Sequence, residues 1–332
     1  MSSNGDSNTD MRWLVLVHHF PQDPGSLRVK IWRRLQTIGA IAIKNSMYAL
    51  PMNEQTQEDF QWILGEIIAG GADGAILESR FVDGMDDQQI RGLFDTARDA
   101  DYASLANEIR ELTERVAQTS VHEDEQKREL KSQLVKFRKK LTAIEAIDFF
   151  GANGRETVEG LLASFVQLVA TDSSVSTAEE TKMKKIQFND VKGRVWVTRH
   201  NVHVDRIASA WLIRRWIDPQ AVFKFTSSKK YSPNNREIRF DMFDAEFTHE
   251  GDKCTFEVLL LRFAFNDRAL IRIAEIIHDL DLKDSKYNHD ETAGIASLIS
   301  GIAAGSDDDD YRIDRGSALL DDLYRSFQAT MK

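Results

Sequence analysis

The sequence predicts an α+β protein with separate N-terminal and C-terminal domains. Three observations lead to this prediction. Short apolar runs and amphipathic segments alternate over the first hundred residues, a charge-rich stretch at helical spacing follows, and the second half holds a few short strands among apolar helices. The first part gives the order strand, helix, strand, strand, helix, strand, which predicts a ferredoxin-like split βαβ domain. A helical hairpin and a mostly helical C-terminal domain follow.

Composition sets the class of protein. The 332 residues are 42% hydrophobic, which is enough for the cores of about two domains and excludes a disordered chain. The net charge of −10 excludes nonspecific attachment of the whole molecule to nucleic acid or to an anionic bilayer. The single cysteine, Cys254, closes no intrachain disulfide. No secretory signal and no membrane-spanning run is found, so we expect a cytoplasmic protein with no membrane partner.

The expected N-terminal domain covers residues 11–98, after a disordered tail at 1–10. Proline and glycine bound its elements: Pro21 follows the first strand and Gly39 ends the first helix, which Ser26 caps. The two middle strands are joined by a tight turn at Lys44 and Asn45. The expected strands are 13–17, 40–43, 46–50 and 75–81, and the expected helices are 27–38 and 56–69.

The next segment, 99–170, is expected to form a helical hairpin and a connector. Leucine, isoleucine and valine recur at heptad-like spacing from Leu105 to Val116, and a second apolar stripe runs from Leu130 to Ile144. Ser120 and Glu123 form a capping box at the start of the second helix. The polar run from Thr171 to Thr181 lacks periodicity, so a linker is expected at 171–190.

The C-terminal domain is expected at 191–332. Three β-rich runs predict strands, and apolar residues at helical spacing predict the helices between and after them. The first of these helices is halted by Asp218 and Pro219. The expected strands are 195–198, 221–226 and 238–243, and the expected helices are 205–217, 255–265, 268–279, 291–304 and 317–328.

Histidines gather in the C-terminal domain. Five of the eight fall between His200 and His289, with several carboxylates around them. Nitrogen and oxygen ligands of this kind suit a divalent metal such as iron, manganese or zinc. The alternative is that these histidines are surface or hydrogen-bonding residues. The candidate metal ligands are His203, Asp205, His249, Glu257, His278 and Asp281.

A second group of residues suits an anion. Arg199 ends a strand and Arg206 lies in the first turn of the next helix, where backbone N–H groups and the helix dipole favour negative charge. His249 lies in a polar loop and is able to bind an anion when protonated or a metal when neutral. The alternative interpretation is that Asp205 neutralises Arg206 and that Arg199 pairs with a neighbouring carboxylate.

One helix of the N-terminal domain is basic in this acidic protein. Arg28, Lys30, Arg33 and Arg34 have no acidic residue between them. Lys30, Arg33 and Arg34 are spaced at three and four and share a face, which suits contacts to DNA phosphates. The alternative is an ordinary solvated face opposite the apolar one.

Several ordered motifs resemble a known family. TRHNVHVDRIASAWLIRRWIDP, FDMFDAEFTHEGDKCTFE, IIHDLDLKDSKY and GIASLISGI resemble the C-terminal domain of the ChrB family of chromate resistance proteins. WLVLVHHFPQDPGSLRVKIWRRLQTIGAIAIKNSMYALP resembles its N-terminal domain, which is similar to the ferredoxin-like part of phenylacetate-pathway repressors of the PaaX kind. The resemblance implies a chromate-responsive transcriptional regulator of an operon that contains a chromate efflux pump.

The resemblance also gives the chemical groups a role. Chromate is a tetrahedral dianion that needs fixed charged donors, so Arg199, Arg206 and His249 are the expected chromate ligands. Operator DNA and chromate are the expected partners, and a symmetric operator predicts a homodimer. The alternative is a metal-dependent redox or detoxifying protein that acts on chromate or another oxyanion. The resemblance favours the regulator over the enzyme.

Overall fold

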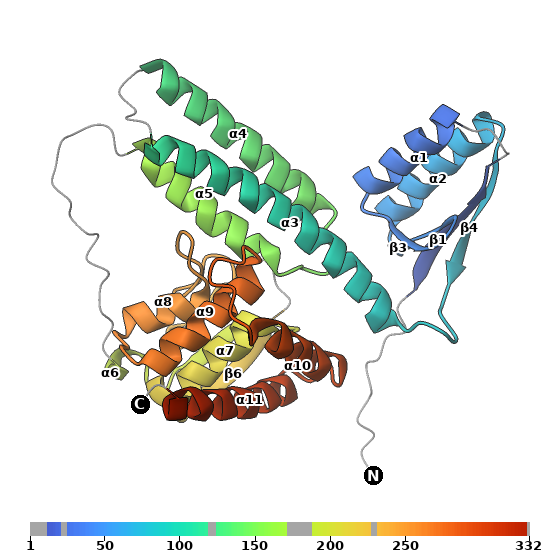
Figure 1. The fold of residues 1–332 in the computed structure, drawn as a ribbon. Coiled ribbons are helices and arrows are strands. Elements are labelled where there is room, and N and C mark those ends of the chain that lie inside the picture. The colour runs from blue at the N-terminus through green and yellow to red at the C-terminus, as the bar shows by residue number, and fades with distance from the viewer. Residues whose placement is uncertain (1–11, 21–24, 119–123, 171–187, 227–230, 331–332) are drawn as a thin grey trace, which may run out of the picture. The chain divides into compact units, whose positions relative to one another are not determined.

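The computed structural model describes residues 12–20, 25–118, 124–170, 188–226 and 231–330 (Figure 1). The chain divides into two compact units, of which the first comprises 1–101 with 139–153 and the second comprises 102–138 with 154–332. Both units combine helices with a small sheet, which confirms the predicted α+β class. Within the described parts of the chain, no helix combines the length and the apolar character needed to cross a bilayer.

The first unit has the predicted split βαβ order. Its four strands pair antiparallel in the order β2-β3-β1-β4, so the first strand lies between the third and the fourth. The turn between β2 and β3 lies at Asn45 and Ser46, one residue later than predicted. The elements are β1 (Trp13–His19), α1 (Gly25–Thr37), β2 (Ile41–Lys44), β3 (Met47–Pro51), α2 (Glu54–Ala69) and β4 (Asp73–Ser79).

Helices α1 and α2 lie side by side on one face of this sheet (Figure 1). Each buries one apolar stripe: α1 buries Ile31 and Leu35, and α2 buries Phe60, Ile63 and Ile67. Asn53 caps α2 by accepting the N–H of Thr56, which satisfies one of the unpaired donors at the helix start. The basic residues of α1 therefore lie on the side of this helix that the core leaves exposed.

Three long helices follow the sheet. They are α3 (Asp87–Gln118), α4 (Asp124–Ala146) and α5 (Gly154–Ala170). The division between the two units falls inside α3 and α4, so the predicted hairpin and connector contribute to both units. The sequence did not predict α5, whose Phe165 packs against Phe137 of α4 with ring centroids 6.0 Å apart. The predicted tail at 1–10, the capping box at Ser120 and Glu123, and residues 171–187 of the predicted linker lie outside the described residues.

The second unit contains a parallel sheet in the order β6-β5-β7. Its helices surround this sheet, and all nine residues of α7 are buried. The elements are α6 (Phe188–Val191), β5 (Val195–Arg199), α7 (Val204–Leu212), β6 (Val222–Thr226), β7 (Glu237–Arg239), α8 (Thr255–Arg262), α9 (Arg268–Leu282), α10 (Thr292–Ala304) and α11 (Asp309–Thr330).

Three predicted elements of this unit differ from the structure. The helix expected at 317–328 begins eight residues earlier, as α11 (Asp309–Thr330). The helix expected at 205–217 ends in a π-helical turn, Ile213–Ile217, which is closed by a hydrogen bond from Asp218 N to Ile213 O at 2.7 Å. The strand expected at 238–243 ends at Arg239, because the chain turns after Phe240 and Asp241 has a positive φ of 45°. This early end directs Asp241 away from the sheet ladder.

The sheet topology positions the site. β5 lies in the centre, and the chain continues from it to β6 on one side and later to β7 on the other. In open α/β sheets, such a reversal opens a crevice outside the carboxyl ends of the strands, and ligands bind there. The carboxyl end of β5 is therefore the place to look for a site.

Candidate functional site

Three segments bring polar side chains to the carboxyl end of β5. Arg199 is the last residue of β5, Asp205 and Arg206 are in the first turn of α7, and Asp241 follows β7. These residues belong to parallel strands and to the helix that leaves the central strand, so their proximity follows from the sheet topology. Sequence reasoning missed Asp241, because the strand expected at 238–243 placed it inside a strand, whereas β7 ends at Arg239.

His249 lies at the centre of a cluster of carboxylates. Its Nε2 is 3.4 Å from Asp205 Oδ2, 3.4 Å from Asp241 Oδ1 and 3.3 Å from Asp281 Oδ2. The His249 side chain is 3% exposed, and Asp281 is the most exposed of the three acids at 14%. We call these four residues the His249 cluster. It combines His249 with Asp205 and Asp281, which the sequence predicted as metal ligands.

Arg206 joins the same cluster through Asp241. Its Nε donates to the Asp241 carbonyl at 3.2 Å and lies 3.4 Å from the carboxylate Oδ2. Asp205 does not neutralise Arg206 as the alternative interpretation expected, because its carboxylate accepts the N–H groups of Thr255 and Phe256 at 2.7 and 2.9 Å. Asp205 thus stabilises the start of α8, and Asp241 is the acidic partner of Arg206.

Arg199 pairs with an acid from α5. Its Nη2 lies 2.7 Å from Glu156 Oε1, and the Glu156 side chain is 2% exposed. The same helix approaches the His249 loop, since a Cβ added at Gly160 would lie 3.1 Å from the Cβ of His249. The alternative interpretation expected Arg199 to pair with a neighbouring carboxylate, and this carboxylate is that of Glu156. Of the three expected chromate ligands, Arg206 and His249 meet on Asp241, whereas Arg199 contacts a different acid.

Burial and charge shift the pKa values in the His249 cluster. Burial alone would lower the pKa of His249, but the carboxylates of Asp205, Asp241 and Asp281 outweigh it and hold the pKa well above its usual value. Burial raises the pKa of Asp281 and of Asp205, and the neighbouring acids raise both further. Burial opposes ionisation of Asp241 too, yet His249 and Arg206 hold its pKa below its usual value. Asp241 is therefore the most acidic member.

The remaining predicted metal ligands lie elsewhere. His278 is fully buried, and its Nδ1 lies 2.7 Å from Glu257 Oε2 while its Nε2 lies 3.2 Å from Asp284 Oδ2. These three residues form the His278 cluster. His203 precedes α7 at its N-cap and is only partly buried. The six candidate ligands thus separate into the His249 cluster, the His278 cluster and His203.

The charges of the His249 cluster limit what it binds. Three carboxylates face two cationic groups, Arg206 and a protonated His249. A cation is attracted to such a site. A dianion is accepted only where an arginine exchanges its internal carboxylate for the incoming oxyanion, or where a further positive charge is present.

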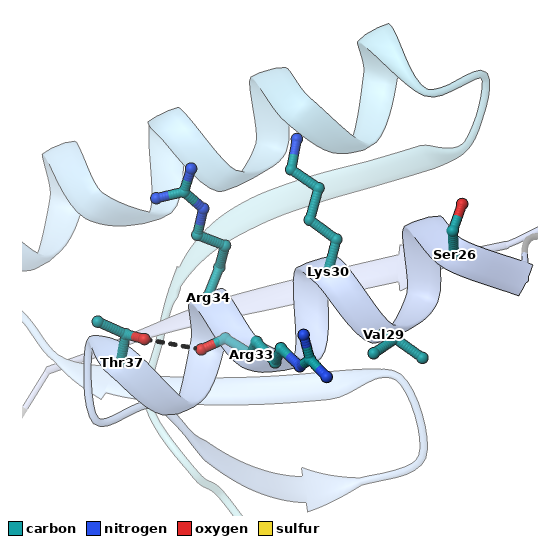
Figure 2. Close-up of a pocket in the computed structure, with 6 residues that line it drawn as sticks. All are labelled: Ser26, Val29, Lys30, Arg33, Arg34 and Thr37. Atoms are coloured by element: carbon teal, nitrogen blue, oxygen red, sulfur yellow. Dashed lines mark hydrogen bonds between the residues drawn. The ribbon is translucent and has the colours of Figure 1, made fainter.

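The basic side chains of α1 line an open pocket of about 540 Å³. Figure 2 shows Lys30 and Arg34 pointing toward α2, with Arg33 and Val29 on the other flank of the helix. Lys30 and Arg34 share one acid, because Glu66 of α2 lies 3.4 Å from the first and 3.3 Å from the second. Arg28 lies outside this pocket, with its guanidinium 5.8 Å from the ring centre of Phe20.

Comparison with known proteins covers most of the chain. The family model described as "Protein ChrB, N-terminal" matches residues 28–181, and the one described as "ChrB, C-terminal domain" matches residues 196–327. The protein named "Protein ChrB" from Cupriavidus metallidurans is 29% identical, and the match spans 98% of both chains. No solved structure matches. Both halves match in order and nearly the full length aligns, so the chain belongs to the ChrB family.

Proposed function

We propose that this protein is a chromate-responsive transcriptional regulator of a chromate-resistance operon. Membership of the ChrB family supports a role in chromate resistance. In this proposal the N-terminal domain binds operator DNA through α1, and the C-terminal domain binds chromate with Arg199, Arg206 and His249. The protein acts in the cytoplasm as a homodimer, because a symmetric operator matches a two-fold protein.

The observation that carries the sensing half is the position of Arg199. It lies at the carboxyl end of the central strand, and its guanidinium contacts the carboxylate of Glu156. A guanidinium presents paired donors that suit a carboxylate or a tetrahedral oxyanion equally well. Chromate is therefore able to replace Glu156 as the anion on Arg199. Such an exchange gives two states with different chromate affinity, as a sensor requires.

The DNA-binding half is supported by the basic residues of α1. Lys30, Arg33 and Arg34 line one pocket on an exposed helix of a protein whose net charge is negative. A local group of cations in an acidic protein favours phosphate contacts at that place only. Trp32 of the same helix is 52% exposed and does not line this pocket.

A gel shift with DNA from upstream of the protein's own operon tests the proposal. We expect the wild-type protein to bind this DNA and chromate to weaken the binding, while sulfate at the same concentration has less effect. Arg199→Ala and Arg206→Ala should bind DNA as the wild type does and should not respond to chromate. Arg236→Ala, which removes an exposed arginine outside the site, is the control. Absence of DNA binding by the wild type would contradict the proposal.

A second candidate function is a metal-dependent redox or detoxifying protein that acts on chromate or another oxyanion. The grouping of Asp205, His249 and Asp281, whose ligand atoms lie within 4.8 Å of one another, favours it. Loss of chromate in the presence of a reductant, combined with no DNA binding, would support this function instead of the regulator.

A further inference from the structure

The His249 cluster has the composition of a metal site. Its members come from separate elements: Asp205 from α7, Asp241 from the end of β7, His249 from the following loop and Asp281 from α9. One ligand atom each from Asp205, His249 and Asp281 lies within 4.8 Å of the others. Atoms that are distant in sequence thus converge on one small, buried volume.

His249 is the second observation, because its buried imidazole leaves one nitrogen without a hydrogen-bond partner and places the other among three carboxylates. Its Nε2 is 3.3 to 3.4 Å from three carboxylates, and none of these three contacts is shorter than the others by more than 0.1 Å. Its Nδ1 is buried and has no hydrogen-bond partner among the described residues. Protein hydrogen bonds from nitrogen to oxygen cluster near 2.9 Å. Three nearly equal, longer separations are the arrangement of ligands around a shared ion.

The His278 cluster provides the contrast within the same unit. His278 Nδ1 lies only 2.7 Å from Glu257, and its Nε2 is also within hydrogen-bond distance of an acid. The nearby Asp279 accepts the backbone N–H groups of Tyr287 and Asn288. Both nitrogens of His278 and the carboxylate of Asp279 therefore have partners in the protein. The His278 cluster is explained without an ion.

We propose that Asp205, His249 and Asp281 bind one divalent cation that prefers oxygen ligands, such as Mn²⁺ or Fe²⁺. Two carboxylates and one imidazole suit these ions. Asp241 lies beside this set and links it to Arg206. Three protein ligands leave coordination positions open, as in metal sites that bind a further molecule.

The cation also solves the charge problem of the proposed function, on which this part of the argument rests. A divalent ion, together with Arg206, balances the three carboxylates of the cluster when His249 is neutral. His249 then binds the ion, and Arg199 and Arg206 remain as the direct ligands of chromate. A bound cation with open positions then attracts a tetrahedral oxyanion to a site that would otherwise repel it. The metal ion would thus supply the additional positive charge that chromate binding needs.

The test is a titration of the full-length, chelator-treated protein with Mn²⁺, without chromate or DNA. We expect one Mn²⁺ per chain, measured by calorimetry and by the change in the Mn²⁺ electron paramagnetic resonance signal. Asp281→Asn and His249→Gln should each lower the affinity at least tenfold. Two variants are used because a single substitution in a buried cluster can unfold the protein, and circular dichroism establishes which of them remain folded.

Asp284→Asn is the matched control, since it makes the same change in the His278 cluster and should bind Mn²⁺ like the wild type. No stoichiometric Mn²⁺ binding by the wild type would overturn the proposal. Wild-type affinity in folded Asp281→Asn and His249→Gln, or an equal loss in Asp284→Asn, would overturn it as well. The readout is independent of the gel shift, so failure of the metal site and failure of the regulator are separate results.

Discussion

Glu156 and Arg199 form an ion pair at 2.7 Å, in which the acid is 2% exposed. Glu156 lies in α5, which begins at Gly154, directly after the last residue of the first compact unit. Arg199 ends the central strand of the parallel sheet in the second unit. An anion that replaces Glu156 on Arg199 would release the first turn of α5. If chromate binds Arg199 as proposed, this contact between α5 and β5 is the one that the bound anion would disturb.

The first prediction concerns Glu156→Gln, which removes the charge and keeps the size of the side chain. If chromate binds Arg199 as proposed, the variant should bind chromate more tightly, because the internal competitor is weakened. The chromate-free variant should lose about 1–3 kcal/mol of unfolding free energy, because the buried ion pair between Arg199 and residue 156 is lost. Calorimetry with chromate and urea unfolding measure the two effects.

Glu159→Gln is the control for this substitution. Glu159 is on the same helix and pairs with Arg155 at 2.8 Å. We expect its chromate affinity to equal that of the wild type. Unchanged affinity in Glu156→Gln, combined with loss of binding in Arg199→Ala, would show that Glu156 does not compete with chromate.

The second prediction concerns the pH dependence of stability at His278. Burial alone would lower the pKa of His278, but Glu257 and Asp284 outweigh it and raise the pKa above its usual value. The stabilisation from its protonated form is therefore fully present below about pH 6.5 and is lost as the pH rises through the higher folded-state pKa. Other charged or titratable groups near this cluster are Asp279, Lys286, Arg110, 4.0 Å from Asp284, and Tyr287, whose ring centre is 5.1 Å from that of His278.

Urea unfolding of the wild type and of His278→Gln between pH 5.5 and 9 measures this contribution. We expect the wild type to be the more stable protein at low pH, and the difference between the two to shrink as the pH rises. A difference that stays constant over this range would mean that folding does not raise the pKa of His278.

The third prediction concerns the packing of α11 on α7. A Cβ added at Gly316 of α11 would lie 2.2 Å from the Cγ2 of Ile207, which is fully buried in α7. Gly316→Ala should therefore lower the unfolding free energy by about 1–3 kcal/mol, because the buried helix must shift. Gly301 of α10 has open space around its Cα, so Gly301→Ala should stabilise by about 0.5–1 kcal/mol. Equal effects of the two substitutions on the urea midpoint would contradict this packing.

The N-terminal sheet was predictable because its signals are local. Pro21, Gly39 and Gly70 mark the ends of short apolar or amphipathic segments, and the order of those segments then specified the split βαβ arrangement. The helix α5 was missed although its apolar residues recur at helical spacing. It was assigned to a connector because the hairpin alone explained the preceding heptad pattern. The π-helical turn at Ile213–Ile217 depends on tertiary packing and has no local signal.

The partners at the candidate site were less predictable than its residues. Asp205 and His249 were expected as metal ligands and share one cluster, yet His278 and Glu257 form another. Their separation depends on which faces of α8 and α9 meet, and spacing along the chain does not determine this. The acid on Arg199 comes from another helix, beyond the linker. Long-range ion pairs of this kind form only in the assembled fold. The sequence therefore predicted which residue types occur at the site but not which of them pair.

The last prediction concerns the proposed DNA-binding surface and depends on Glu66, whose carboxylate pairs with both Lys30 and Arg34. Glu66→Gln should tighten DNA binding at low salt, because both cations become available to phosphates.

Arg33→Ala should weaken binding to all sequences and reduce the steepness of its salt dependence by about 0.9, the value for one phosphate contact. Glu58→Gln removes the same charge from an exposed position of α2 that makes no ion pair with α1 among the described residues, and it is the control. Fluorescence anisotropy of labelled operator DNA, measured from 50 to 300 mM salt, gives the DNA affinity and its salt dependence. Over this range the Debye length falls by somewhat more than half. If the DNA affinity of Arg33→Ala depends on salt as steeply as that of the wild type, α1 does not contact the DNA backbone through Arg33.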